Sequence, residues 1–191
     1  MEKEQEQQAE VKENTRLHHR GYKRVVVKGV MMKDMLGTDP ADEKECLKYN
    51  VKQLNVLPRE NEHIRFKPWW FRAGLRDTAH IFGHSKTLPL KYIHSYDVQV
   101  TKLPKDKTFI KTLTICPEDK GIKSGRVSNY EVLPAGTEFE FSCLFPSDGV
   151  GGLKPETFKQ WLEIVFNEGF GSIRKGEYGK CALTDFKVKS F

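Results

Sequence analysis

The strictest alternation of hydrophobic and polar positions in this chain lies between Thr137 and Phe145. Apolar and polar residues take turns there: Phe139, Phe141, Cys143 and Phe145 against Glu138, Glu140 and Ser142. Because successive side chains of a strand point to opposite faces of a sheet, this pattern predicts a strand with one face in the core and the other in solvent. The residues from Cys181 to Lys189 also alternate, so we predict a final strand there.

Further segments have the composition of strands. The segment from Tyr22 to Val30 contains a run of β-branched valines followed by Gly29, which is typical of a buried strand. The segments from Tyr92 to Lys102 and from Thr108 to Cys116 follow, and the second is rich in Thr and Ile. Basic residues are frequent in and after these two segments: Lys102, Lys105, Lys107, Lys111, Lys120, Lys123 and Arg126.

Two segments have the period of an amphipathic helix. One runs from Pro155 to Glu168, with Gly169 suited to its C-terminal cap. The other runs from Trp70 or Phe71 to Phe82, with a proline before it and a glycine after it. We expect the apolar faces of the helix at 155–168 and the strand at 137–145 to share one core: Phe139, Phe141, Phe158, Trp161, Leu162 and Phe166.

The order of the elements predicts the fold. Residues 1–20 are almost devoid of apolar side chains, so we predict a flexible tail there. Residues 21–191 are predicted to form a single domain. Within it, 31–67 has no lasting period and is predicted to be an insertion after the first strand, with a short helix near Cys46. The remaining order favours an α+β protein with a ferredoxin-like (RRM-like) βαββαβ core, in which both helices cover one face of an antiparallel sheet.

Composition limits the compartment and the partners. No apolar run is long enough to cross a bilayer, and the N-terminus lacks the apolar stretch of a secretory signal, so we expect a cytoplasmic protein without a membrane partner. The cysteines form no CxxC or Cys/His cluster, which predicts reduced thiols, no metal site and no cofactor. The net charge of +6 mildly favours a polyanionic partner.

A glycine-rich segment between the second helix and the last strand is the first candidate for a binding site. It combines glycines with basic residues: Gly169, Gly171, Gly176, Gly179, Arg174 and Lys175. Glycines let a backbone approach phosphates and present N–H groups, while Arg and Lys supply charge. Phe170 and Tyr178 could stack on unpaired bases. The alternative is that the glycines only shape a tight loop at the end of a helix.

A second candidate is the polar face of the first helix. Arg72, Arg76 and His80 recur at helical spacing and form a basic stripe, although such a face is often simply solvated. The neighbouring Trp69 and Trp70 could stack on bases, but core or subunit contacts are the favoured interpretation for adjacent tryptophans.

These motifs resemble those of a known family. The sequence LPAGTEFEF from Leu133 to Phe141, the helix after it, and GFGSIRKGEYGK together resemble the C-terminal half of RAMP-superfamily proteins, the RNA-binding proteins of CRISPR systems. The sequence FKPWWFRAGLRDTAHIFG, from Phe66 to Gly83, resembles the segment where those proteins begin their first helix beside RNA. The likeness is greatest to the backbone subunits that polymerise along guide RNA, and phages also encode relatives.

The resemblance implies non-catalytic binding of single-stranded RNA and head-to-tail self-association within a larger ribonucleoprotein assembly. It implies contacts with the nucleic-acid backbone for the following residues: Arg72, Arg76, Gly171, Arg174 and Lys175. Because the sequence does not distinguish RNA from DNA, a phage protein that binds single-stranded DNA is an alternative.

An enzyme is the other alternative. Some RAMP relatives are metal-independent ribonucleases in which a histidine moves protons. The histidine candidates are His18, His19, His80, His84 and His94. Other relatives cleave target RNA with an aspartate after the first strand, where Asp34 and Asp39 lie here. No P-loop, nucleophile or paired-carboxylate motif accompanies them, so a binding protein is favoured.

Overall fold

The computed structural model describes residues 21–89, 93–104, 108–115, 126–146, 154–171 and 178–190. The expected flexible tail at 1–20 lies outside these residues. Within them, two main β-sheets are combined with helices, which confirms the predicted α+β class. No helix in this part of the chain is long and apolar enough to cross a membrane.

The first sheet is antiparallel throughout, and its strands come from distant parts of the chain. They are β1 (Tyr22–Met31), β7 (His94–Lys102), β10 (Glu138–Pro146) and β11 (Cys181–Ser190), in the spatial order β11-β1-β10-β7. β1 is therefore central, as its run of valines predicted, and Val27 lies opposite both Phe141 and Phe186. The strand expected from Tyr92 begins at His94.

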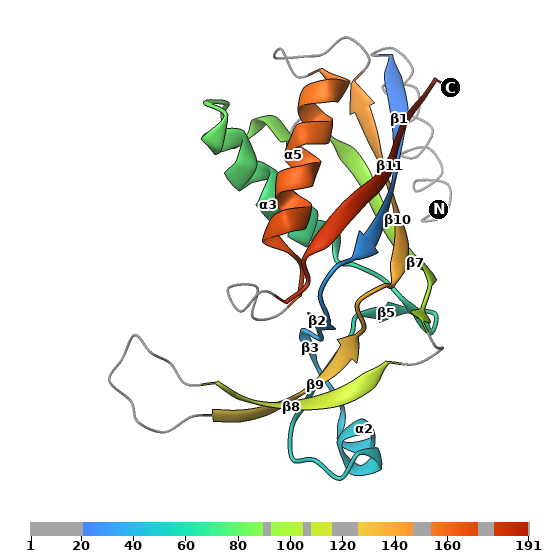
Figure 1. The fold of residues 1–191 in the computed structure, drawn as a ribbon, viewed down its shortest axis with the longest axis vertical. Coiled ribbons are helices and arrows are strands. Elements are labelled where there is room, and N and C mark those ends of the chain that lie inside the picture. The colour runs from blue at the N-terminus through green and yellow to red at the C-terminus, as the bar shows by residue number, and fades with distance from the viewer. Residues whose placement is uncertain are drawn as a thin grey trace, which may run out of the picture.

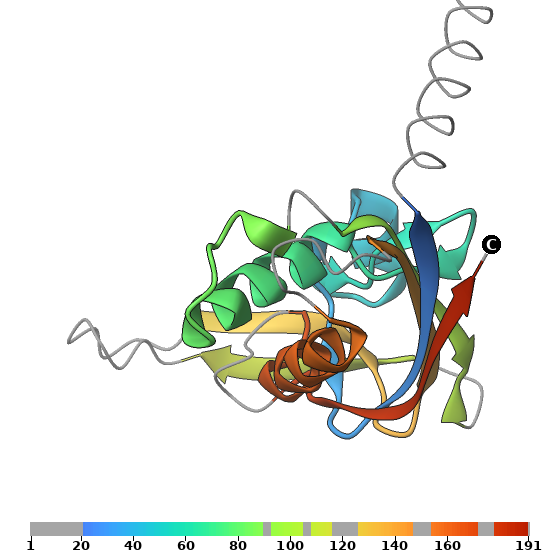
Figure 2. The same cartoon turned by 90° about the horizontal axis from the view of Figure 1, so that it is seen from above.

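Two helices lie side by side over one face of this sheet (Figure 1, Figure 2). α3 (Pro68–Ile81) and α5 (Pro155–Glu168) each begin with a proline, whose fixed φ and missing N–H suit the first turn of a helix. The two helices approach closely at Gly74, where a Cβ atom would lie 2.8 Å from Cγ1 of Val165. Both predicted helices are thus confirmed, and α3 begins two or three residues earlier than expected.

The core between the helices and the sheet is largely aromatic. The ring centroids of Phe71 and Phe141 are 4.5 Å apart, and those of Phe145 and Phe158 are 5.1 Å apart. The residues of the predicted core are at most 1% exposed and belong to one cluster: Phe139, Phe141, Phe158, Trp161, Leu162 and Phe166. The prediction of a shared core is confirmed.

A second sheet lies below the first in Figure 1. Its strands are β2 (Met35–Leu36), β3 (Asp39–Pro40), β4 (Leu54–Val56), β8 (Phe109–Ile115) and β9 (Arg126–Leu133). The short helix α2 (Glu43–Lys48) contains Cys46, as predicted, and β5 (Arg59–Glu60) pairs with β6 (His63–Ile64). The strand predicted at 108–116 belongs to this sheet and not to the first, because it pairs with β9.

A buried carboxylate holds the second sheet in place. Glu131 on β9 is 5% exposed and accepts hydrogen bonds from the Leu57 N–H at 2.9 Å, from Arg59 Nη1 at 2.8 Å and from Thr108 Oγ1 at 2.7 Å. Burial by itself would raise the pKa of Glu131, but these donors outweigh it and hold the pKa below its usual value. Beyond β6, a bridge between Arg65 and Gln99 continues the connection to β7 of the first sheet.

Candidate functional site

The chain passes from β1 directly into the second sheet, and the residues around the glycine-rich segment brace this turn. The backbone N–H groups of Met32 and Lys33 donate to the carbonyl oxygen of Lys180 at 2.8 and 3.2 Å. The Gly179 N–H donates to the carbonyl oxygen of Asp34 at 2.7 Å. The end of the segment therefore lies where the two sheets meet.

The described glycines of this segment allow close packing. Gly169, Gly171 and Gly179 have φ values of 86°, 84° and 72°, a region that side chains of L residues disfavour. A Cβ atom on Gly171 would lie 2.6 Å from the carbonyl oxygen of Leu36, and one on Gly179 would overlap the carbonyl group of Phe170. The interpretation that the glycines shape a tight loop accounts for these positions.

Tyr178 points from the segment toward the second sheet. Its ring is half-buried against a small apolar cluster: Leu36, Leu113, Tyr130 and Val132. The ammonium group of Lys111 on β8 lies 5.2 Å from the centroid of the Tyr178 ring, which is the geometry of a cation–π contact. The structure thus combines Tyr178, one of the two aromatic residues predicted to stack on bases, with a cation from another strand. The other, Phe170, is 1% exposed in the main core, so the prediction that it stacks on bases is wrong.

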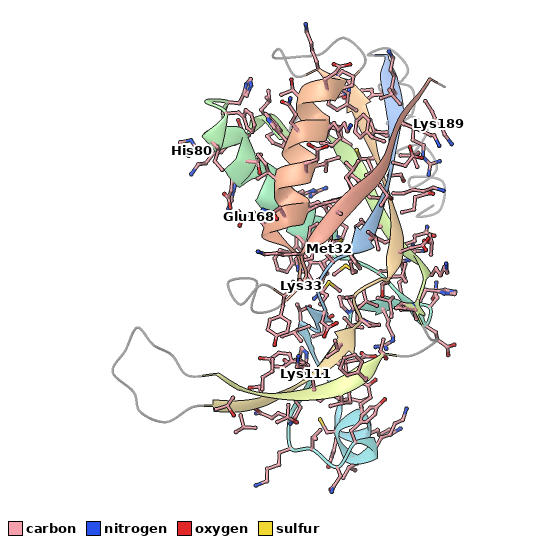
Figure 3. All side chains as sticks on the ribbon, in the orientation of Figure 1. Met32, Lys33, His80, Lys111, Glu168 and Lys189 are labelled. Carbon is pink, nitrogen blue, oxygen red and sulfur yellow. The ribbon has the colours of Figure 1, made fainter. Side chains whose placement is uncertain are left out.

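Further cations gather around the same junction. Lys33 is exposed two residues after the end of β1, and Lys180 is half-buried directly before β11. Figure 3 shows Lys33 at the level where the sheets meet and Lys111 below it on the second sheet. We call the following residues the inter-sheet surface: Lys33, Lys111, Gly171, Tyr178 and Lys180. Across the described part of the chain, neither Lys33 nor Lys111 pairs with a carboxylate.

The predicted basic residues of α3 start near this junction and lead away from it. The ring of Trp70 in the first turn of α3 stacks on Phe170, with the ring centroids 6.4 Å apart. Arg72 and Arg76 follow on the exposed side of the helix. His80 lies toward the far end of α3 (Figure 3). The predicted Arg174 and Lys175 lie outside the described residues.

The two tryptophans have different environments. Trp70 is 5% exposed and belongs to the main core, as favoured from the sequence. Trp69 is 57% exposed, with its ring centroid 6.0 Å from that of Trp70. Only Trp69 therefore presents a large surface to a partner.

The aspartates considered for catalysis have structural contacts. Asp34 Oδ1 accepts a hydrogen bond from the Ala135 N–H at 3.0 Å. Asp39 accepts hydrogen bonds from Thr38 and from the ammonium group of Lys67. Both carboxylates thus bind neighbouring segments of the fold.

The candidate histidines that the structure describes have different surroundings. His84 packs edge-on against the ring of Trp161 at 5.3 Å, and the His94 ring lies 6.0 Å from that of Tyr22. His18 and His19 fall outside the described residues. In the described ranges, no group of His, Cys, Asp and Glu side chains could hold a metal ion.

Lys33, Lys111 and Lys180 are not predicted as binding residues from the sequence. The missed signal is the strand β9, which places β8 and its Lys111 beside the glycine-rich segment. Alternation of Val127, Asn129 and Glu131 with Ser128, Tyr130 and Val132 was visible in the sequence. Its hydrophobic contrast is weak, because both sets mix apolar and polar residues.

Comparisons with known proteins show similarity of fold. No family model matches the sequence, and no curated protein matches it. Among solved structures, a chain from a cryo-EM structure of the Type III-B Cmr-beta bound to cognate target RNA matches with a TM-score of 0.66 and 14% identity. The match covers 99% of this chain and 67% of that chain. The two chains therefore share an architecture over nearly the whole of this protein.

Proposed function

We propose that this protein binds single-stranded nucleic acid on the inter-sheet surface, with RNA preferred over DNA. The observation that carries the proposal is the Lys111 ammonium group 5.2 Å above the Tyr178 ring, with Lys33 and Lys180 around the same junction. Ammonium groups attract phosphates and release their counterions. An aromatic ring beside them offers a face to an unpaired base.

Two similarities support RNA as the ligand. The sequence motifs resemble those of RAMP-superfamily proteins, and the fold is similar to that of a chain from the Cmr-beta bound to target RNA. We therefore take this protein to be a RAMP-type relative with a ferredoxin-like core. The strand order β11-β1-β10-β7 and the placement of α3 and α5 on one face support this assignment.

The same similarities favour a role as a non-catalytic subunit of a CRISPR ribonucleoprotein. In such an assembly, further copies of this chain associate along the RNA. The strand would continue from the inter-sheet surface along the residues implied by the resemblance: Arg72, Arg76, Gly171, Arg174 and Lys175. Phosphate contacts of this kind provide affinity with little selection between bases. A cytoplasmic location agrees with this role.

The test is an electrophoretic shift assay with the full chain in EDTA. End-labelled single-stranded RNA, single-stranded DNA of the same sequence and the corresponding duplex are compared. We expect the single-stranded RNA to shift at the lowest protein concentration and to remain intact. Absence of a shift would contradict the proposal, and discrete cleavage products would favour the metal-independent ribonuclease instead.

A further inference from the structure

The second sheet carries a cavity that the proposed binding surface does not explain. It has a volume of about 520 Å³, which is sufficient for a small organic ligand. Its walls include apolar and polar residues from β3, from the residue after β3, and from β4 and β9: Pro40, Ala41, Leu54, Asn55, Ser128 and Tyr130. Lys52 also lines it, from the exposed loop before β4. The cavity is thus partly apolar, with polar groups and a cation at hand.

The strand register connects this cavity to the inter-sheet surface. Lys111 on β8 is the partner of Tyr130 on β9, Tyr130 is the partner of Asn55 on β4, and Asn55 is the partner of Pro40 on β3. Paired residues lie next to each other on the same face of a sheet. One row of side chains therefore leads across the sheet from the Lys111–Tyr178 contact to the cavity.

The polar groups of the cavity have unused hydrogen-bonding capacity. Asn55 donates its side-chain N–H to the carbonyl oxygen of Asn129 at 3.4 Å, and because that partner only accepts, the orientation of the Asn55 amide is defined. Within the described residues, no donor reaches Asn55 Oδ1, and the hydroxyl groups of Ser128 and Tyr130 make no hydrogen bond. The cavity therefore offers one fixed acceptor and two hydroxyl groups of adaptable polarity.

We propose that this cavity receives one unpaired base of the strand bound on the inter-sheet surface and selects for a base with an exocyclic amino group. The proposal rests on the proposed function. The amino groups of adenine, cytosine and guanine donate hydrogen bonds, which Asn55 Oδ1 accepts, whereas uracil presents carbonyl oxygens at the corresponding positions. Leu54 and Pro40 form apolar walls for the base, and Lys52, which also lines the cavity, supplies a cation for its phosphate.

The experiment is a fluorescence-anisotropy titration of the full chain with labelled oligo(A), oligo(C) and oligo(U) ribonucleotides of equal length. We expect wild-type protein to bind oligo(A) and oligo(C) about fivefold to tenfold more tightly than oligo(U). The variant Asn55→Ala should bring this ratio close to one while leaving the affinity for oligo(U) unchanged. Ser128→Val, which replaces a hydroxyl group of the cavity wall with methyl groups and suits a strand, should do the same.

The control is Thr114→Val, at an exposed position near the end of β8. Thr114 pairs with Val127, the neighbour of Ser128 on β9. It should keep the wild-type ratio, and thermal melting shows that each variant is folded. Equal wild-type affinities for all three oligonucleotides, or an equal loss for all three in both cavity variants, would overturn the base-selective cavity while the proposed function stands. Absence of binding to any oligonucleotide would overturn both.

Discussion

At the scale of single residues, Gly179 and Gly83 share a backbone conformation but differ in their surroundings. Their φ values are 72° and 73°. A Cβ atom on Gly179 would overlap the carbonyl group of Phe170, whereas nothing lies within 4 Å of a Cβ atom on Gly83. Substitutions at these two glycines therefore distinguish two effects on the free energy of unfolding. Both place a side chain at positive φ, but only the substitution at Gly179 also disturbs the junction between the sheets.

Gly179→Ala should lower the free energy of unfolding by about 3 kcal/mol or more, because strain and overlap add. Gly83→Ala should lower it by about 1 kcal/mol, since only the backbone conformation is penalised. Urea denaturation monitored by tryptophan fluorescence measures both values. Equal losses in the two variants would show that Gly179 is not packed as described.

Glu131 gives a prediction about acid stability. The pKa of Glu131 is lowered in the folded protein. The carboxylate therefore stabilises the fold at pH values above its pKa in the unfolded chain, about 4.3, and this stabilisation is lost as the pH falls through its pKa in the folded chain. Glu131→Gln should cost about 2 kcal/mol at neutral pH, and the difference from wild type should shrink on acidification. Glu60→Gln is the control, because the Glu60 side chain is 69% exposed. A difference from wild type that stays constant down to about pH 3 would contradict the role of Glu131.

At the scale of elements, the helices and strands with one buried and one exposed face were the easiest to predict from the sequence. β10 and α5 have this property, so their periods of two and 3.6 residues are plain in the sequence. β9 could not be predicted from the sequence, because its buried residues include the polar Ser128 and Glu131 as well as Tyr130 and Val132, so burial does not follow the hydrophobic pattern. β2 and β3 are two residues long each and depend on their partners β9 and β4, so no local pattern marks them.

The packing of α5 is tested by comparing two tryptophans. Trp161 is fully buried between the helix and the sheet, so Trp161→Ala should cost about 3–5 kcal/mol. Trp69 is 57% exposed on α3, so Trp69→Ala should change stability by less than about 0.5 kcal/mol. Thermal and urea unfolding of the two variants provide the comparison. Retention of wild-type stability by Trp161→Ala would show that the core is misassigned.

At the scale of the whole molecule, the inter-sheet surface exists only because distant segments come together. Lys33 follows β1, Lys111 lies on β8 and Tyr178 precedes β11. The local motifs identified the glycine-rich segment, whose close packing then brings Tyr178 onto the second sheet. Lys33 and Lys111 could not be singled out, since a lysine in a turn or strand has no local feature that distinguishes a binding role from a solvated one.

The most direct test of the central claim is the salt dependence of RNA binding by two matched double variants. Lys33→Ala with Lys111→Ala removes cations of the inter-sheet surface, and Lys187→Ala with Lys189→Ala removes the same charge from β11. Each lysine that binds a phosphate contributes about −0.7 to the slope of log K against log salt for a single strand. The first variant should bind more weakly, with a slope shallower by about 1.4, while the second keeps the wild-type slope. Equal slopes and affinities for the two variants would contradict binding on the inter-sheet surface.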